Sequence, residues 1–175
     1  MPQVEILEQK GYHFLWIDSQ MFMWDVPEEF EYQREIARQA HGNVLVAGYG
    51  LGVSQKCLLE NPRVASVRTV ELLREVVDEC RRVYGSIHGE VFVGDFFDYQ
   101  TERKFDCVIG DTWAEASAKH LDEYIRFKRK ARSLVKPDGK IIGWGMDYLE
   151  YLLTTRSKRP ALTQDHNQST PRPNR

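Results

Sequence analysis

The stretch that most constrains this chain is residues 44–53, which reads VLVAGYGLGV. Apolar residues typical of a β-strand lead directly into glycines at alternate positions, Gly48, Gly50 and Gly52. Glycine permits positive φ and lets a ligand approach the backbone where a β-carbon would clash. A strand that ends in GxGxG predicts a turn that binds a nucleotide-sized ligand. A tight strand-to-helix connection without a ligand is the alternative.

The chain has 175 residues and a hydrophobic fraction of 42%, which suits one domain with its own core. A formal net charge of −2 gives no overall attraction to nucleic acid or to an acidic membrane. The N-terminus lacks the basic-then-apolar order of a leader, and no apolar run approaches the roughly 20 residues that span a bilayer. We therefore expect a cytoplasmic protein without membrane partners.

The cysteines and histidines show no metal-binding pattern. Cys57, Cys80 and Cys107 are far apart in the sequence and form no CxxC pair, so reduced and mostly buried thiols are expected. The five histidines show no HExxH motif and no paired spacing. The sequence predicts no metal site.

The N-terminal part has a different pattern from the rest. Three short β-rich runs, VEIL, YHFLWI and QMFMW, are divided by turn-forming pairs and predict a β-hairpin or meander over residues 1–25. A proline and two acids then favour the start of a helix at residues 28–40.

From residue 43 onward, apolar strands alternate with amphipathic helices, which is typical of a parallel sheet with helical crossovers. We expect strands at residues 44–47, 66–71, 90–93, 105–110 and 140–144. Helices are expected at residues 53–60, 72–84, 96–100, 115–134 and 147–153. The prediction is a Rossmann-like, doubly wound α/β domain over residues 26–155, with about five core strands in a mostly parallel sheet. No further strand is predicted after residues 140–144, so the expected sheet lacks a C-terminal strand pair.

Two basic segments raise the question of nucleic-acid binding. Residues 156–175 carry three prolines and five basic residues against one acid, which predicts a disordered tail. Residues 126–132 put several cations on the long helix, with Phe127 as their aromatic residue. A solvated tail and a solvated helix face are the commoner explanations, so a nucleic-acid partner is not expected.

Three acids follow successive predicted strands: Glu71, Asp95 and Asp111. Ligands of open parallel sheets bind at the carboxyl ends of the strands. Glu71 stands 19 positions after Gly52, where an acid accepts hydrogen bonds from ribose hydroxyls. A dinucleotide fingerprint would need a third glycine where Val53 stands, so a single nucleoside with a short zwitterionic arm is favoured over NAD. Each acid could instead serve as a helix cap or a helix-start charge.

The constellation resembles the class I S-adenosylmethionine-dependent methyltransferases, and within that fold it looks most like the spermidine synthase group. The resemblance runs over roughly residues 11–149. It is carried by FEYQ at residues 30–33, VLVAGYGLG, VRTVE ending at Glu71, VGDFF around Asp95, and FDCVIGD ending at Asp111. The order and spacing of these segments are more specific than any one of them.

The resemblance implies a role for each residue of the site. Gly48, Tyr49, Gly50 and Gly52 would border the methionine part of S-adenosylmethionine or its decarboxylated form, Glu71 and Leu72 would contact the ribose and its surroundings, and Asp95 and Phe96 would contact adenine. Asp111 would face the reaction centre as the general base. Tyr32, Gln33 and Trp113 would shape the acceptor side.

Two departures from the polyamine synthases matter. These enzymes usually carry GGGDGG where this chain has GYGLGV, so Leu51 replaces an acid that would hold the acceptor amine. They also carry DSSDP where residues 111–115 read DTWAE, although Glu115 lies one position later than the second acid. A diamine needs carboxylates to offset its desolvation, so putrescine chemistry is disfavoured.

The resulting hypothesis is an S-adenosylmethionine-dependent methyltransferase that acts on a small-molecule acceptor. Aminopropyl transfer of the spermidine synthase kind is one alternative. A non-catalytic module that binds S-adenosylmethionine or another nucleoside is a second, and an NAD-dependent enzyme ranks below both. The sequence leaves open whether the chain forms a homo-oligomer.

Overall fold

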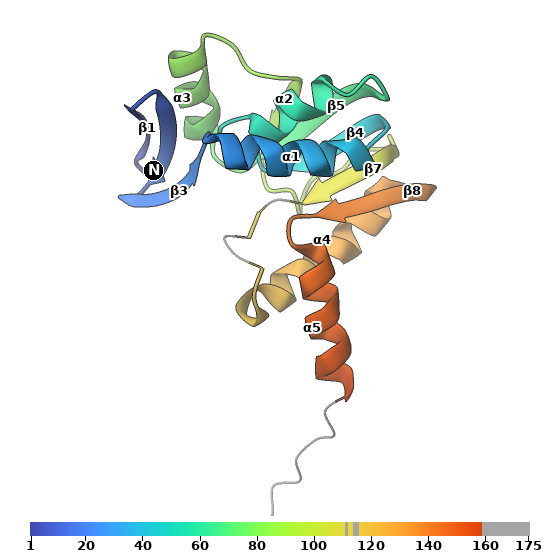
Figure 1. Ribbon diagram of the computed structural model, residues 1–175. Coiled ribbons are helices and arrows are strands. Elements are labelled where there is room, and N and C mark those ends of the chain that lie inside the picture. The colour runs from blue at the N-terminus through green and yellow to red at the C-terminus, as the bar shows by residue number, and fades with distance from the viewer. Residues whose placement is uncertain (111, 114–115, 159–175) are drawn as a thin grey trace, which may run out of the picture.

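The computed structural model describes residues 1–110, 112–113 and 116–158. A five-stranded sheet forms its centre, with the spatial order β6-β5-β4-β7-β8 and every neighbouring pair parallel (Figure 1). Its strands are β4 (Gly42–Ala47), β5 (Val64–Glu71), β6 (Glu90–Val93), β7 (Phe105–Gly110) and β8 (Val135–Gly143). Within the described residues no strand follows β8. The predicted doubly wound α/β fold is confirmed.

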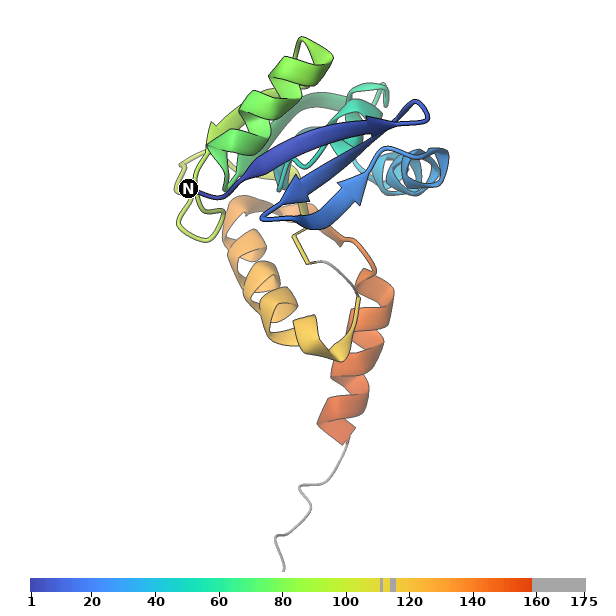
Figure 2. The same ribbon diagram turned by 90° about the vertical axis from the view of Figure 1, so that its left-hand side faces the viewer.

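A three-stranded antiparallel sheet precedes the central sheet, in the order β1-β2-β3. Its strands are β1 (Val4–Gln9), β2 (Tyr12–Ile17) and β3 (Gln20–Trp24), so the expected meander is present. Figure 2 shows this small sheet lying against α3 (Arg74–Tyr84). The contact includes a hydrogen bond from the backbone N–H of Ile6 to the Glu79 carboxylate, 3.3 Å long.

Helices cover both faces of the central sheet because its strands alternate apolar side chains between the two faces. Val44 and Val46 pack on the side of α1 (Pro27–Gln39), α2 (Val53–Leu59) and α3. Leu45 and Ala47 pack on the opposite side. That side is covered by α4 (Leu121–Leu134), which follows the short 3-10 helix η1 (Ala118–His120). Helix α5 (Met146–Lys158) packs against α4 and extends away from the sheet (Figure 1).

Four predicted elements differ from the structure by more than two residues. Residues 96–100 contain a turn rather than a helix, and the long helix begins at η1, later than residue 115. Strand β8 begins at Val135 and not at residue 140, because Val135 pairs with Phe105 before the register shifts. Helix α5 continues to Lys158, into the segment expected to be disordered. Residues 159–175 lie outside the described residues.

Candidate functional site

The carboxyl ends of the five parallel strands meet at one edge of the sheet, and β4 ends there in the glycine turn. Gly48, Gly50 and Gly52 all have positive φ, at 91°, 54° and 76°. A β-carbon at Gly50 would collide with the thioether sulfur of Met23, and one at Gly52 would lie 2.7 Å from the Tyr49 hydroxyl oxygen. The backbone conformation therefore favours glycine at all three positions, and close neighbours on the protein itself add to that requirement at Gly50 and Gly52.

Glu71 at the end of β5 holds the glycine turn in place. One of its carboxylate oxygens accepts a hydrogen bond from the backbone N–H of Tyr49 at 2.7 Å, and the other accepts one from the N–H of Leu73 at 2.8 Å. The residue is only 7% exposed. A carboxylate offers about four lone-pair positions, so each oxygen keeps one for a further donor.

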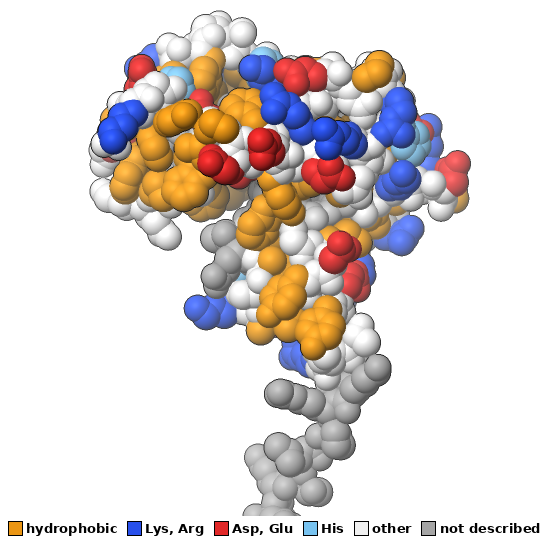
Figure 3. Space-filling model, viewed as in Figure 1, with side chains coloured by type: hydrophobic (Ala, Val, Ile, Leu, Met, Phe, Trp, Pro, Cys, Tyr) orange, Lys and Arg blue, Asp and Glu red, His pale blue; other side chains and the backbone are white. Residues whose placement is uncertain are grey.

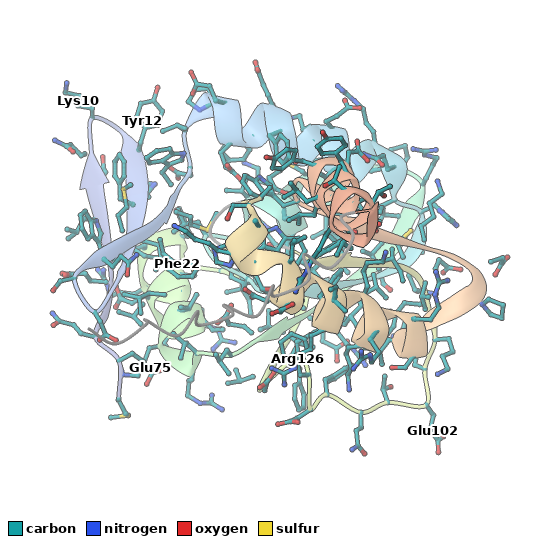
Figure 4. All side chains as sticks on the ribbon, turned by 90° about the horizontal axis from the view of Figure 1, so that it is seen from below. Lys10, Tyr12, Phe22, Glu75, Glu102 and Arg126 are labelled. Carbon is teal, nitrogen blue, oxygen red and sulfur yellow. The ribbon has the colours of Figure 1, made fainter. Side chains whose placement is uncertain are left out.

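A cavity of about 300 Å³ opens beside the turn. Its lining residues come from β3, α1, the glycine turn, the start of α2 and the segments that follow β7 and β8. They are Met21, Phe22, Met23, Trp24, Glu29, Gln33, Gly48, Tyr49, Gly50, Ser54, Thr112, Trp113 and Trp144. Figure 4 views the molecule from below and labels Phe22 on β3. The walls are mainly aromatic and methionine side chains, with Glu29 as the acid among these described residues.

Several of the predicted site residues border this cavity: Gly48, Tyr49, Gly50, Gln33 and Trp113. The indole N–H of Trp113 donates to the backbone carbonyl of Trp144 at 2.9 Å, which fixes its ring at the cavity wall. Gln33 is buried and donates to the Glu29 carboxylate at 2.9 Å. Tyr32 is outside the lining, where its hydroxyl accepts a hydrogen bond from the N–H of Gly145 at 3.1 Å.

The other predicted residues lie at the neighbouring strand ends, away from the cavity lining. Leu72 follows β5 and is 63% exposed. Asp95 follows β6 and accepts a hydrogen bond from the N–H of Phe97 at 2.7 Å, as a turn-capping acid does. The ring of Phe96 is buried and stacks on Phe127 of α4, with ring centroids 5.7 Å apart. Gly52 is the residue before α2.

Two predicted residues cannot be placed. Asp111 and Glu115 lie outside the described residues, so the roles assigned to them from the sequence stay predictions. The hydroxyl of Thr112, between these two residues, donates to the Glu123 carboxylate at 3.2 Å.

Tyr49 connects the turn to the segment between α3 and β6. Its hydroxyl accepts a hydrogen bond from the backbone N–H of His88 at 2.9 Å, and its side chain is 4% exposed. Burial raises the pKa of this phenol to about 12. Burial likewise raises the pKa of the Cys80 thiol to about 12, and that thiol donates to the carbonyl of Gly50 at 3.2 Å. Both groups are neutral and structural under ordinary conditions.

Sequence reasoning missed Glu29, Ser54, Thr112, Trp144 and the four β3 residues of the lining. Glu29 stands one helical turn before Gln33, so the spacing of four residues could have identified it as a neighbour on the same helix face. Ser54 is 7% exposed, and its hydroxyl has no hydrogen-bond partner among the described residues. The β3 residues gave no signal, because their position depends on how the small sheet packs on the turn.

Solved structures with this arrangement of strands and helices include a spermidine synthase from Thermotoga maritima, with 16% sequence identity and a TM-score of 0.64. A spermidine synthase in complex with the transition-state analogue AdoDATO matches with 17% identity and a TM-score of 0.63. Each match covers 90% of this chain and 60% of the other chain. A S-adenosylmethionine-dependent methyltransferase from Clostridium acetobutylicum matches with 17% identity and a TM-score of 0.50, over 67% of this chain and 50% of that one.

The chain has the class I S-adenosylmethionine-dependent transferase fold. This confirms the fold that the sequence resemblance implied. The chain spans about half to three fifths of the length of these structures. No protein-family model and no curated protein matches the sequence. In this class I fold, the glycine turn after β4 and Glu71 after β5 occupy adjacent strand ends.

The described residues were also compared with the requirements of a metal site, a disulfide and a membrane span. They contain no group of three or more histidine, cysteine and acidic side chains that could hold a metal ion. Cys57, Cys80 and Cys107 are buried free thiols. No helix among the described residues has the length and apolar character needed to cross a membrane.

Proposed function

We propose that this chain binds S-adenosylmethionine across the carboxyl ends of β4 and β5 and transfers its methyl group to a small acceptor in the adjoining cavity. The proposal depends above all on Glu71, a buried carboxylate that is hydrogen-bonded to the backbone of the glycine turn. The names of the matching structures, which include methyltransferases and spermidine synthases, support the same class of cofactor. Decarboxylated S-adenosylmethionine would fit the same nucleoside site.

The residues present fit the nucleoside and its arm. Glu71 keeps lone pairs for the two ribose hydroxyls, and the exposed side chain of Leu72 offers an apolar surface at the next position. The Ser54 hydroxyl lines the cavity beside the glycine turn and has no partner among the described residues, so it can bond a polar group of the arm. Buried polar groups are seldom left unbonded, which favours a polar ligand here.

When bound, S-adenosylmethionine supplies a methyl carbon attached to a positively charged sulfur. The chain's own part is to hold the acceptor near that carbon, to exclude water and to take up a proton. The aromatic rings of Trp113 and Trp144 exclude water and favour a neighbouring cation. We assign proton uptake to Asp111, which follows Gly110 in the sequence; among the described residues, Glu29 is the carboxylate that lines the cavity.

Methyl transfer is favoured over aminopropyl transfer by the position of Leu51. Its side chain is buried in the hydrophobic core, so nothing at this position offers a charge to an acceptor amine. A diamine in a cavity walled by aromatic and thioether groups would leave one ammonium without a carboxylate among the described lining residues.

Calorimetric titration with S-adenosylmethionine and S-adenosylhomocysteine tests the proposal directly. We expect binding by the intact chain, and binding weakened in Glu71→Gln and in Leu72→Ala. Lack of binding by the intact chain would reject the proposal. Release of methylthioadenosine from decarboxylated S-adenosylmethionine with putrescine would instead establish aminopropyl transfer.

A further inference from the structure

The side of the cavity formed by α1 and β3 combines one carboxylate with apolar walls. The carboxylate is that of Glu29 on α1, and the walls are Phe22, Met23 and Trp24 of β3. Figure 3 shows hydrophobic side chains gathered over the three-stranded sheet, with acidic side chains over α1 beside them. A ligand in this part of the cavity contacts one carboxylate and otherwise apolar side chains.

The Glu29 carboxylate is held in place but not neutralised. It accepts a hydrogen bond from the buried Gln33 amide at 2.9 Å, which orients it from the following turn of the same helix. The ion pairs between described residues do not include Glu29, and no other side chain of the described residues bonds to its carboxylate. A negative charge beside aromatic walls is best offset by a cation from the ligand.

We propose that the acceptor is an apolar monoamine, bound as an ammonium by Glu29 with its hydrocarbon body against the β3 wall. After the ammonium gives one proton to a carboxylate, its nitrogen lone pair would form the bond to the methyl carbon, and the sulfur would keep the electrons of the broken S–C bond. This inference rests on the proposed function, because it names the substrate class of the same site. One carboxylate balances one ammonium, and the surrounding rings favour a hydrocarbon or aromatic body over a second charge. At about 300 Å³ the cavity lies at the small end of the ~300–1,000 Å³ typical of ligand sites.

Three probes separate the contribution of the single ammonium to binding from that of the apolar body. They are 2-phenylethylamine, its uncharged counterpart 2-phenylethanol, and the diamine putrescine. Binding is measured by calorimetry and by the fluorescence of the cavity tryptophans, Trp24, Trp113 and Trp144. We expect phenylethylamine to bind roughly tenfold or more tightly than either of the other two, because a hydrogen bond to a charged group contributes about 1.5–3 kcal/mol and one factor of ten corresponds to about 1.4 kcal/mol.

The decisive variant is Glu29→Gln, and Glu28→Gln is its matched control. Glu28 precedes Glu29 in α1, is exposed and is absent from the cavity lining. Its substitution by glutamine removes the same charge. Glu29→Gln should lower phenylethylamine affinity roughly tenfold while leaving phenylethanol affinity unchanged, and Glu28→Gln should change neither.

The inference is overturned if phenylethylamine does not bind at millimolar concentration, if Glu29→Gln and Glu28→Gln behave alike, or if putrescine binds as tightly. Titration with S-adenosylmethionine in parallel keeps the two proposals apart. Amine binding without cofactor binding would reject the transferase and retain the amine site. Cofactor binding without Glu29-dependent amine binding would reject the amine site and leave the proposed cofactor binding in place.

Discussion

The carboxylate of Glu71, at the end of β5, accepts a hydrogen bond from the backbone N–H of Tyr49, in the turn after β4, at a distance of 2.7 Å. Its second oxygen accepts from Leu73, at the approach to α3. One buried acid therefore joins two neighbouring strand ends and the start of a helix. The same residue that is proposed to hold the ribose also fixes the shape of the turn that would border the methionine arm.

Replacing Glu71 with alanine should therefore impair folding and binding together. The change leaves two backbone N–H groups without their acceptor, and each unsatisfied donor costs about 1–3 kcal/mol. We expect a lower free energy of unfolding in urea, and no rise in melting temperature when S-adenosylmethionine is added.

Leu72→Ala is the control for the folding component. Its side chain is 63% exposed, so its removal should leave the melting temperature of the free protein nearly unchanged. A Glu71→Ala protein as stable as the original, or one still stabilised by the cofactor, would contradict the double role of this carboxylate.

The contact between Met23 and Gly50 predicts strong coupling between β3 and the glycine turn. Gly50→Ala puts a β-carbon at φ +54°, in the left-handed region, and against the Met23 sulfur. Left-handed backbone costs roughly 1–2 kcal/mol for such a residue, and overpacking adds about 1–3 kcal/mol. The variant should be clearly destabilised in urea denaturation.

A double-mutant cycle separates the two components of that cost. Met23→Ala removes the collision but not the backbone strain, so the double variant should lose less stability than the sum of the single variants. Additive losses would show that the sulfur is not what Gly50 accommodates. Methionine is flexible enough that part of the coupling will be absorbed by a change of rotamer.

Short-range patterns were enough to predict the central sheet and the turn. The apolar run before Gly48 predicts both that β4 is a strand and that it is buried on two faces. The alternation of strands and helices predicts where β5 ends, and therefore that Glu71 lies at a strand end. These features depend on neighbours within a few residues, which the sequence displays directly.

The features that were wrong or missed depend on contacts between distant segments. Residues 96–100 were predicted to form a short helix, but Phe96 lies in a turn, where its ring stacks on Phe127 of α4. Glu29 appeared to be a helix-start acid. It lines a cavity because Met23 packs β3 against the glycine turn, and no local pattern encodes that packing.

Alkaline pH should destabilise the protein partly through Tyr49. Its pKa is raised by burial from 10.0 to about 12, so the folded state keeps its proton where the unfolded chain has lost it. This contribution to stability is complete below about pH 10 and is lost as the pH rises toward 12. Tyr49→Phe should reduce the fall in unfolding free energy over that range.

The same variant has an opposite effect at neutral pH. Without the hydroxyl, the N–H of His88 loses its acceptor, which should cost about 1–3 kcal/mol. Urea denaturation at pH 7, 9 and 10.5 measures both effects. An unchanged slope against pH would mean that the pKa of Tyr49 is the same in the folded and unfolded states, contrary to its burial.

Trp113 should matter more for the acceptor than for the nucleoside. Its ring borders the cavity and packs edge-on against Tyr124 and Phe127, with centroids 5.5 Å away in both cases, and its N–H donates to Trp144. Trp113→Phe removes that hydrogen bond and shortens the wall. We expect a loss of about 1–3 kcal/mol in stability and a several-fold weaker affinity for phenylethylamine, with a smaller change for S-adenosylmethionine.

Trp16→Phe provides the matched control, since Trp16 belongs to β2 and is absent from the cavity lining. It makes the same chemical change in the N-terminal sheet, so it should leave the affinities for both ligands as they are. Calorimetry on the two variants at equal fractions folded separates binding from stability. If Trp16→Phe and Trp113→Phe lower phenylethylamine affinity equally, the effect is a general loosening of the fold, and Trp113 does not form the acceptor wall.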